Sequence, residues 1–281
     1  MSVQYRILFS DLDATLLNNK KEIEPGTEKA IREMLRHGSF FVICTGRSLA
    51  SARAVAARFG LDCPGCYIVA YNGGVLYDPS KDRIISYASI PIPVVKKMFE
   101  QAQRASLYIH TYDRADDSVL TLRHTPELDY YVAHTGLMPK IGSDVLERIT
   151  QEPAKMIVIN LDQPEKLERF QKENAAWSDD VLNSFFSCRQ YLEYCPAGIS
   201  KGTAVTALCR HLHISPEAAV AAGDERNDIA MLRAAGIGAA PRNAHPLAKE
   251  AADYVCEADH EQGAVGEIIR KFFCAGKHAV R

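Results

Sequence analysis

The sequence lacks any long apolar run, since no stretch approaches the roughly 18 apolar residues that a membrane-spanning helix requires. It also lacks a basic amino-terminal region followed by an extended apolar segment, the pattern typical of a secretory signal. Positive charge is not in excess, because the formal net charge at pH 7 is −2 over 281 residues. These absences give no reason to expect a nucleic-acid or membrane partner, and they favour a cytoplasmic protein.

Disulfide bonds are not expected, although the chain contains eight cysteines. The cysteines are scattered, and without a secretory signal we expect them to be reduced and mostly buried. Cys63 and Cys66 have the spacing of a redox motif, but the apolar run Tyr67–Ala70 follows them directly. A redox dithiol normally opens a helix, so this segment is interpreted as a turn that enters a strand. A redox or zinc role is the alternative.

Apolar runs alternate with segments of helical periodicity along the first part of the chain. A strand of about six residues is predicted around Ile7–Phe9, because that run is too short for a typical helix. Further strands are predicted at 39–44 and 66–74, with helices at 29–38 and 49–59 between them. This alternation predicts an α/β fold with a doubly wound parallel sheet.

The length of 281 residues favours two domains over a single core. A hairpin is predicted at 75–90, after which the composition changes, and residues 86–190 are interpreted as an inserted α/β domain with helices on one face of a sheet. The first domain is assigned to residues 1–85 and 191–281. The insert and its carboxyl-terminal border are predicted to contain helices at 91–104, 126–134, 143–151 and 164–177, and strands at 106–112, 118–124, 155–161, 181–188 and 190–196. Beyond it, helices are predicted at 203–213, 229–235 and 265–273, and strands at 216–222, 236–240 and 252–256.

Two carboxylates, Asp11 and Asp13, come directly after the first predicted strand. Carboxylates this close repel each other unless a cation or a proton relieves them. A hard divalent cation with oxygen ligands, Mg2+ above all, is the natural partner. An acidic turn without a ligand is the alternative interpretation of these two residues alone.

Three more segments with specific chemistry end a strand or open a helix. They are TGRS at 45–48, SKG at 200–202 and GDERND at 223–228, in addition to DLDAT at 11–15. In a parallel sheet all four can meet at one edge. Phosphoryl transfer needs such a set: a nucleophile, a proton donor, a metal ion, and cationic and neutral donors around the developing charge.

In this order the four segments resemble the motifs of the haloacid dehalogenase (HAD) superfamily of phosphotransferases. The form of the last motif and the place of the insert resemble the Cof-like subfamily with a type IIB cap. The resemblance implies a Rossmann-like catalytic core and an inserted cap that covers the site and reads the leaving group. It also implies a Mg2+-dependent phosphatase that acts on small phosphorylated metabolites, often sugar phosphates. The chain departs from the usual motif at Ala14, where the family has glycine.

The resemblance assigns the chemical steps to the carboxylates. Asp11 would attack phosphorus and form an aspartyl-phosphate, while Asp13 would protonate the leaving oxygen and then activate water. Mg2+ would be bound by the Asp11 carboxylate, the Asp13 backbone carbonyl and Asp224. Asp228 would support these ligands or replace one of them. The alternative interpretation is that Asp228 has no role in binding and is simply an acidic residue favoured at the amino terminus of a helix. Thr15 would hold the loop in shape.

The resemblance assigns phosphate binding to the remaining motif residues. The Thr45 hydroxyl and the Gly46 backbone would hold phosphoryl oxygens, Lys201 would neutralise charge, and Asn227 would donate to the phosphoryl group or orient an aspartate. Two further residues that could reach the substrate or line its pocket are Arg47 and Asn243.

Two other functions stay open from the sequence. A phosphosugar mutase would use a related aspartyl-phosphate but return the phosphoryl group to its substrate. A phospho-acceptor or binding module would hold the phosphate without turnover. The physiological substrate and the choice between monomer and homodimer do not follow from the sequence.

Overall fold

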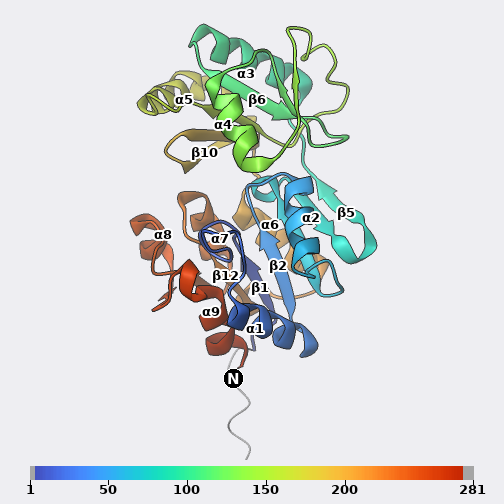
Figure 1. Ribbon diagram of the computed structural model, residues 1–281, viewed down its shortest axis with the longest axis vertical. Coiled ribbons are helices and arrows are strands. Elements are labelled where there is room, and N and C mark those ends of the chain that lie inside the picture. The colour runs from blue at the N-terminus through green and yellow to red at the C-terminus, as the bar shows by residue number, and fades with distance from the viewer. Residues whose placement is uncertain (1–3, 275–281) are drawn as a thin grey trace, which may run out of the picture. The chain divides into compact units, whose positions relative to one another are not determined.

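The chain forms two compact units, each built on its own sheet (Figure 1). Residues 4–274 are described by a computed structural model. The first unit contains the described residues up to Arg47, then Ala52–Ser86 and those from Ser200 onward, and the second contains Ser48–Ser51 and Tyr87–Ile199. In the part of the chain that is described, no helix combines the length and the hydropathy needed to cross a bilayer.

An eight-stranded sheet in the order β14-β13-β12-β1-β2-β3-β4-β5 forms the first unit. Its strands are β1 (Ile7–Ser10), β2 (Phe40–Cys44), β3 (Cys66–Ala70), β4 (Val75–Asp78), β5 (Arg83–Tyr87), β12 (Ala219–Ala222), β13 (Ile237–Ala240) and β14 (Tyr254–Val255). The six strands from β14 to β3 pair in parallel, and β4 is antiparallel to β3. The predicted α/β fold with a parallel sheet is confirmed.

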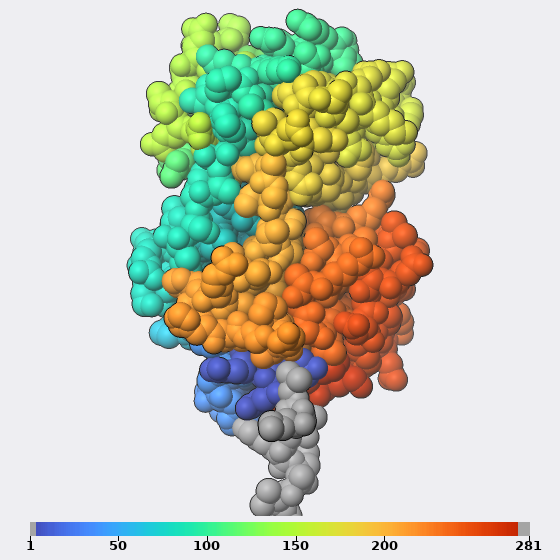
Figure 2. Space-filling model, turned by 180° about the vertical axis from the view of Figure 1, so that it is seen from behind, coloured from blue at the N-terminus to red at the C-terminus, as the bar shows by residue number. Residues whose placement is uncertain are grey.

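Helices connect these strands and bury the faces of the sheet. They are α1 (Pro25–Arg36), α2 (Leu49–Arg58), α6 (Lys201–His211), α7 (Ile229–Ala234), α8 (Pro246–Ala251) and α9 (Ala264–Phe273). Ile7 and Phe9 of β1 lie in one apolar cluster with Leu208 of α6 and Leu232 of α7. Figure 2 shows the amino-terminal residues in blue against the orange and red residues beyond 200, so segments far apart in the sequence complete one unit.

The second unit contains a six-stranded sheet in the order β10-β11-β9-β6-β7-β8. Its strands are β6 (Tyr108–Tyr112), β7 (Val119–Thr121), β8 (Pro139–Ile141), β9 (Met156–Ile159), β10 (Leu182–Cys188) and β11 (Tyr191–Pro196), and its helices are α3 (Ile92–Arg104), α4 (Pro126–Thr135) and α5 (Glu165–Ser178). Phe99 of α3 and Leu167 of α5 share a core with Ile109 and Val158. These two helices therefore cover one face.

Helix α4 lies on the other face of this sheet, so the prediction of helices on one face was incomplete. Successive side chains of β6 point to opposite faces of the sheet. Ile109 packs in the core with α3 and α5, so Tyr112 lies on the opposite face. Tyr131 of α4 contacts Tyr112 through their hydroxyls, 2.5 Å apart, and its ring lies 4.4 Å from that of His110. The buried Tyr131 therefore belongs to a polar layer of the second unit.

Three details of the second unit differ from the sequence predictions. Residues 143–151 form a turn instead of a helix, and the three-residue strand β8 was not predicted. Pro153 disfavours helical backbone just before it, and so short a segment is marginal as a helix. The expected border at residue 190 also precedes β11, which pairs with β9 and β10 in the second sheet. The chain returns to the first unit only at Ser200.

Candidate active site

Asp11 stands at the carboxyl end of β1, the central strand of the first sheet. All four residues of β1 are buried, and the Asp11 amide donates to the Ala222 carbonyl of β12 at 2.9 Å. The strand pairing thus continues as far as Asp11 and fixes its backbone. Its carboxylate lies at the edge where the parallel strands end, which is the binding edge of open α/β sheets.

Lys201, the first residue of α6, lies against this carboxylate. Its ammonium group is 2.5 Å from Asp11 Oδ1 and 2.6 Å from Asp228 Oδ1, and its side chain is only 1% exposed. The next residue, Gly202, lets α6 approach α7 closely, because an added Cβ would lie 2.3 Å from the Ala230 carbonyl oxygen. The predicted Ser-Lys-Gly segment therefore places a buried cation beside Asp11.

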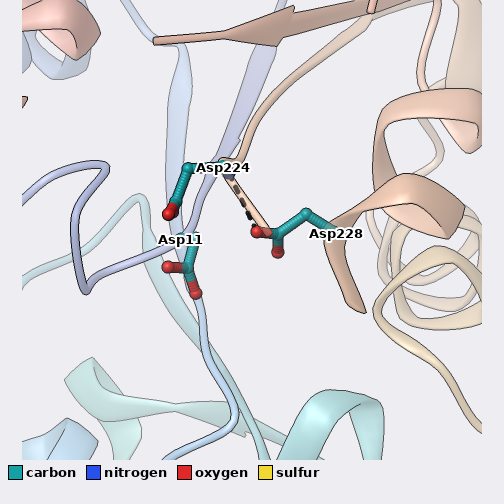
Figure 3. Close-up of side chains that lie close together, drawn as sticks. All are labelled: Asp11, Asp224 and Asp228. Carbon is teal, nitrogen blue, oxygen red and sulfur yellow. Dashed lines mark hydrogen bonds between the residues drawn. The ribbon is translucent and has the colours of Figure 1, made fainter. Parts of the chain in front are cut away.

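Asp228 is fully buried and supports both Lys201 and the turn after β12. Its Oδ1 accepts from Lys201, and its Oδ2 accepts from the backbone amides of Asp224 and Glu225, both at 3.0 Å. Figure 3 shows the hydrogen bond from the Asp224 amide. Asp228 is therefore more than an acid at a helix end, because it holds two other site elements in place.

Asp11, Asp224 and Asp228 form a carboxylate cluster. One oxygen of each lies within 4.8 Å of the others, and the carboxylate of Asp224 points toward Asp11 (Figure 3). Thr15 donates to Asp224 Oδ1 at 2.6 Å. When all three carboxylates are ionised, the Lys201 ammonium leaves two negative charges uncompensated. Oxygen donors with this surplus fit one hard divalent cation.

Burial, together with the charges of neighbouring carboxylates, raises the pKa values of two of these carboxyl groups. Burial raises the pKa of Asp11 to about 7, with the charges of Asp228 and Asp13 adding to it and Lys201 opposing it. Burial, followed by the charges of Asp11 and Asp228, raises the pKa of Asp224 to about 8. A cation bound between these groups would favour their ionised forms and lower both pKa values.

The Asp13 side chain lies outside the carboxylate cluster. Its two oxygens accept from Arg47 Nε at 2.8 Å and Nη2 at 2.6 Å, and Lys21 lies 2.7 Å from Oδ1. Burial acts to raise the pKa of Asp13, but the hydrogen bonds and charge of Arg47, together with Lys21, lower it to about 2. Asp13 is thus ionised in this arrangement. The proposed binding of a metal by its carbonyl stays a prediction.

The loop after β2 lies against the segment after β3. The Asn72 amide donates to the Thr45 carbonyl at 3.0 Å, and the Arg47 amide donates to Thr45 Oγ1 at 3.1 Å. Asn227 Nδ2 donates to Asn72 Oδ1 at 3.0 Å, and a Cβ on Gly46 would lie 3.1 Å from that same oxygen. Asn72 therefore brings together three of the four residues predicted to bind phosphate, Thr45, Gly46 and Asn227.

Asn72 is a site residue that the sequence analysis missed. It is 1% exposed, and three consecutive residues, Tyr71, Asn72 and Gly73, have φ values of 52°, 55° and 108°. Left-handed backbone costs roughly 1–2 kcal/mol for an ordinary residue, and less for asparagine. The available signal was the Asn-Gly-Gly run directly after a predicted strand, at the same sheet edge as the other motifs.

Asn243 contacts the loop that follows Asp13. Its Nδ2 donates to the Ala14 carbonyl at 2.8 Å, and its Oδ1 accepts from the His260 amide at 3.0 Å. Ala14 has φ of 57°, a conformation that favours glycine. The departure from the usual motif therefore has a conformational cost, and Asn243 helps to hold the loop in this shape.

Together, the fold and the site define a member of a known family. Residues 8–269 match the family of haloacid dehalogenase-like hydrolases. The chain belongs to this family of enzymes, and the resemblance drawn from the motifs is confirmed.

Two curated relatives cover nearly the whole chain. The 5-amino-6-(5-phospho-D-ribitylamino)uracil phosphatase YcsE of Bacillus subtilis is 27% identical over 268 residues, covering 95% of this chain and 96% of its own length. The HMP-PP phosphatase of Serratia proteamaculans is 23% identical over 275 residues, covering 95% of this chain and 94% of its own length. Their names give two different substrates.

Solved structures share the complete fold. A haloacid dehalogenase-like hydrolase from Bacteroides thetaiotaomicron has a TM-score of 0.85 and 28% identity, covering 96% of this chain and 100% of that one. The HAD subclass IIB sugar phosphatase BT4131 has a TM-score of 0.79 and 22% identity, covering 95% and 98%. At that identity the second likeness concerns the fold alone, and it agrees with the type IIB arrangement expected from the insert.

Proposed function

We propose that this enzyme is a Mg2+-dependent phosphatase that hydrolyses small phosphorylated metabolites, sugar phosphates among them, through an aspartyl-phosphate on Asp11. The observation that carries the proposal is the carboxylate cluster at the end of β1, where Asp11, Asp224 and Asp228 outnumber the Lys201 cation. Such a surplus of carboxylates attracts a divalent cation. Asp11 would then be the nucleophile for a phosphate ester, and the cation would be the centre of positive charge beside it.

In the proposed first step, Asp11 attacks phosphorus and the bond from phosphorus to the ester oxygen breaks. Asp13 gives its proton to the leaving oxygen. In the second step Asp13 takes a proton from water, the water oxygen attacks the aspartyl-phosphate, and inorganic phosphate leaves with Asp11 regenerated. Asp13 can carry a proton only after it parts from Arg47, so we propose that the substrate phosphate draws the Arg47 guanidinium away.

The other residues bind and orient the phosphoryl group in this proposal. Bound Mg2+ would be held by Asp11 and Asp224, with the Asp13 carbonyl as a further ligand, and would supply positive charge to the phosphoryl oxygens. Thr45 and the Gly46 amide donate to those oxygens, and Asn227 donates from the opposite loop. Lys201 lowers the negative charge that an incoming phosphate meets.

The substrate class is proposed from the relatives, and the individual substrate is left open. The two curated relatives are named for different phosphorylated compounds, one of which carries a ribityl phosphate. A small phosphate ester is what these names share. Assembly as a monomer or a homodimer and a cytoplasmic location stay predictions.

The first experiment measures phosphate release from a panel of sugar phosphates, nucleotides and p-nitrophenyl phosphate, with Mg2+ or with EDTA. We expect release that depends on Mg2+ and that falls roughly 10⁴-fold or more in Asp11→Asn, because the nucleophile is lost. Circular dichroism of the variant checks that it folds. Equal release by Asp11→Asn would contradict the proposed mechanism.

The same panel separates the two alternatives. A phosphosugar mutase would yield an isomerised sugar phosphate in place of free phosphate. A phospho-acceptor module would keep the phosphoryl group on Asp11 after a single transfer. The ion pair between Asp13 and Arg47 favours this second alternative, because a carboxylate whose pKa is lowered to about 2 is a weak base toward water and the aspartyl-phosphate would persist. Mass spectrometry of the rapidly quenched protein distinguishes the three outcomes.

A further inference from the structure

We propose that Cys63 and Cys66 form a site of reversible thiol–disulfide exchange, at which a low-molecular-weight disulfide is reduced and an internal disulfide forms in the turn before β3. The Sγ atoms of the two residues lie 3.7 Å apart. The exchange proposal and the phosphatase proposal are independent of each other.

The backbone between the two cysteines already has the shape that a bridge needs. The Cys66 amide donates to the Cys63 carbonyl at 3.0 Å, which closes a four-residue turn. Pro64 fixes its own φ near the value for the second position, and Gly65 has φ of 92° at the third position. Proline followed by a glycine at positive φ is typical of a type II turn. The two thiols therefore face each other without any change in the fold.

Neighbouring strands hold this turn in place. The Phe41 amide of β2 donates to the Gly65 carbonyl at 3.0 Å, and Cys66 is the first residue of β3. Cys66 is thus part of the sheet, and only the Cys63 side has freedom to adjust. A disulfide bond is about 2.05 Å long, so rotation of the Cys63 side chain has to close most of the remaining gap.

The difference in exposure between the two thiols gives them different roles. Cys63 is partly exposed, whereas Cys66 is buried and burial raises the pKa of its thiol. An external disulfide can reach Cys63, and the thiolate is the attacking species in such exchange. Cys63 is therefore the residue that reacts first, and Cys66 is the residue that resolves the product.

The exchange balances in two steps. The Cys63 thiolate attacks one sulfur of the external disulfide, a mixed disulfide forms, and one thiolate leaves. The Cys66 thiolate then attacks the Cys63 sulfur, the internal bond forms, and the second thiolate leaves. The two protons lost by the cysteines are taken up by the two leaving thiolates. The pair thus clears an adduct from Cys63 without help from another protein.

The test incubates the full-length protein in mixtures of reduced and oxidised glutathione, then quenches with acid and labels the remaining thiols with N-ethylmaleimide. In the oxidised mixtures we expect the peptide containing both cysteines to lose two hydrogen atoms and to take up no label. Returning the sample to reduced glutathione restores two labels. Two labels on this peptide in every mixture, or a lasting glutathione adduct on Cys63, would overturn the proposal.

Variants assign the two roles. In Cys66→Ala we expect one glutathione adduct that stays on Cys63, and in Cys63→Ser we expect no adduct on Cys66. An adduct on Cys66 in the second variant would contradict the order of the steps. Cys188→Ser, which removes a partly exposed thiol of β10, is the control and should leave the internal disulfide unchanged.

The turn itself can be tested without touching either sulfur. Gly65→Ala strains the turn, and the dithiol can relax away from it whereas the disulfide cannot, so we expect the equilibrium to shift toward the dithiol. Gly60→Ala is the matched control, because Gly60 also has a positive φ of 64° but follows α2. Equal shifts in the two variants would show that the turn does not favour the bridge.

Discussion

Each unit buries a lysine almost completely, and the two lysines differ in the charge around them. In the second unit, Lys155 and Glu193 form an ion pair at 2.9 Å, with side chains only 2% and 4% exposed. In the first unit, Lys201 pairs with both Asp11 and Asp228, and a third carboxylate lies close to them. One cation thus meets one anion in the second unit and three in the first.

The difference separates a structural ion pair from a binding site. The second carboxylate oxygen of Glu193 accepts from Ser187 at 2.5 Å, so this buried charge is balanced and hydrogen-bonded within its own unit. Burying charge is costly unless it is paired in this way. The first unit has three carboxylates for one lysine at a sheet edge, and the surplus is balanced by protons or by a cation from solution. We infer that a surplus of carboxylates over cations indicates a binding site more reliably than the burial of a charged side chain does.

The largest expected effect is on activity, and it compares two identical substitutions. Lys201→Met removes the cation beside Asp11, so we expect kcat for phosphate release to fall about 10²–10³-fold. Lys155→Met removes the cation of the structural pair, so we expect the folded fraction to keep its kcat. Steady-state kinetics, scaled to the folded fraction measured by circular dichroism, checks both. Equal losses of kcat in the two variants would contradict the distinction between a site lysine and a structural lysine.

The next effect concerns the free energy of unfolding. Lys155→Met leaves Glu193 buried without its cation and should lower this free energy by about 3–5 kcal/mol. The double variant Lys155→Met with Glu193→Leu should regain most of the loss, because an apolar pair often replaces a buried ion pair at little cost. Urea denaturation of wild type, Lys155→Met, Glu193→Leu and the double variant gives the four free energies of unfolding for this double-mutant cycle.

The matching double variant in the first unit should behave differently. Lys201→Met with Asp228→Leu also removes an ion pair, but it leaves the amides of Asp224 and Glu225 without their acceptor. We therefore expect no recovery of stability. Recovery equal to that in the second unit would mean that Asp228 serves only as the partner of Lys201.

A smaller effect is expected from adding or removing the metal. Mg2+ at about one hundred times its dissociation constant should stabilise the folded chain by about 2.7 kcal/mol, and EDTA should reverse this. Asp224→Asn should abolish the stabilisation because it removes a ligand, whereas Glu193→Gln should keep it. Thermal unfolding with and without Mg2+ gives the measurement, and a shift that survives in Asp224→Asn would place the metal elsewhere.

The smallest effect is a pH dependence in the second unit. Burial, together with the charge of Lys155, lowers the pKa of His110 well below its ordinary value, so the folded state keeps this ring neutral. The unfolded chain takes up a proton near pH 6.5. The free energy of unfolding should therefore fall as the pH decreases below about 6.5, by up to about 1.4 kcal/mol per pH unit.

A variant isolates this contribution from the carboxyl groups. In His110→Phe the part of the slope between pH 6.5 and 5 that belongs to this ring should disappear, whatever the change in overall stability. Urea denaturation at several pH values gives the two slopes. Identical slopes would show that the ring is protonated inside the fold or does not titrate on unfolding.

Most of the site residues followed from short segments of sequence. Asp11, Lys201 and Asp224 each stand within a few residues of a strand end or a helix start, and the parallel topology brings such positions together. The partners of long side chains did not follow. Arg47 reaches Asp13, 34 positions earlier in the chain, and no local pattern indicates which acid a flexible guanidinium will meet.

The fold was predictable where elements are long and periodic, and it was less so where they are short. The central strands and the longer helices have apolar patterns that indicate their type. Helix α8 has six residues and β8 has three, so tertiary contacts decide whether they form. The segment 143–151 shows the reverse case, in which helical spacing of apolar residues occurs in a turn.

The interrupted first unit has a consequence for folding during synthesis. Thr15 and Asp224, which share a hydrogen bond, are 209 positions apart in the chain. At about 5–20 residues per second, a ribosome needs roughly 10–40 seconds to make the residues between them. Throughout that interval β1 has no β12 to pair with and its apolar edge is open to other chains, even after the second unit has been completed at Ile199. We therefore expect nascent chains that stall after residue 199 to be the ones that chaperones must hold.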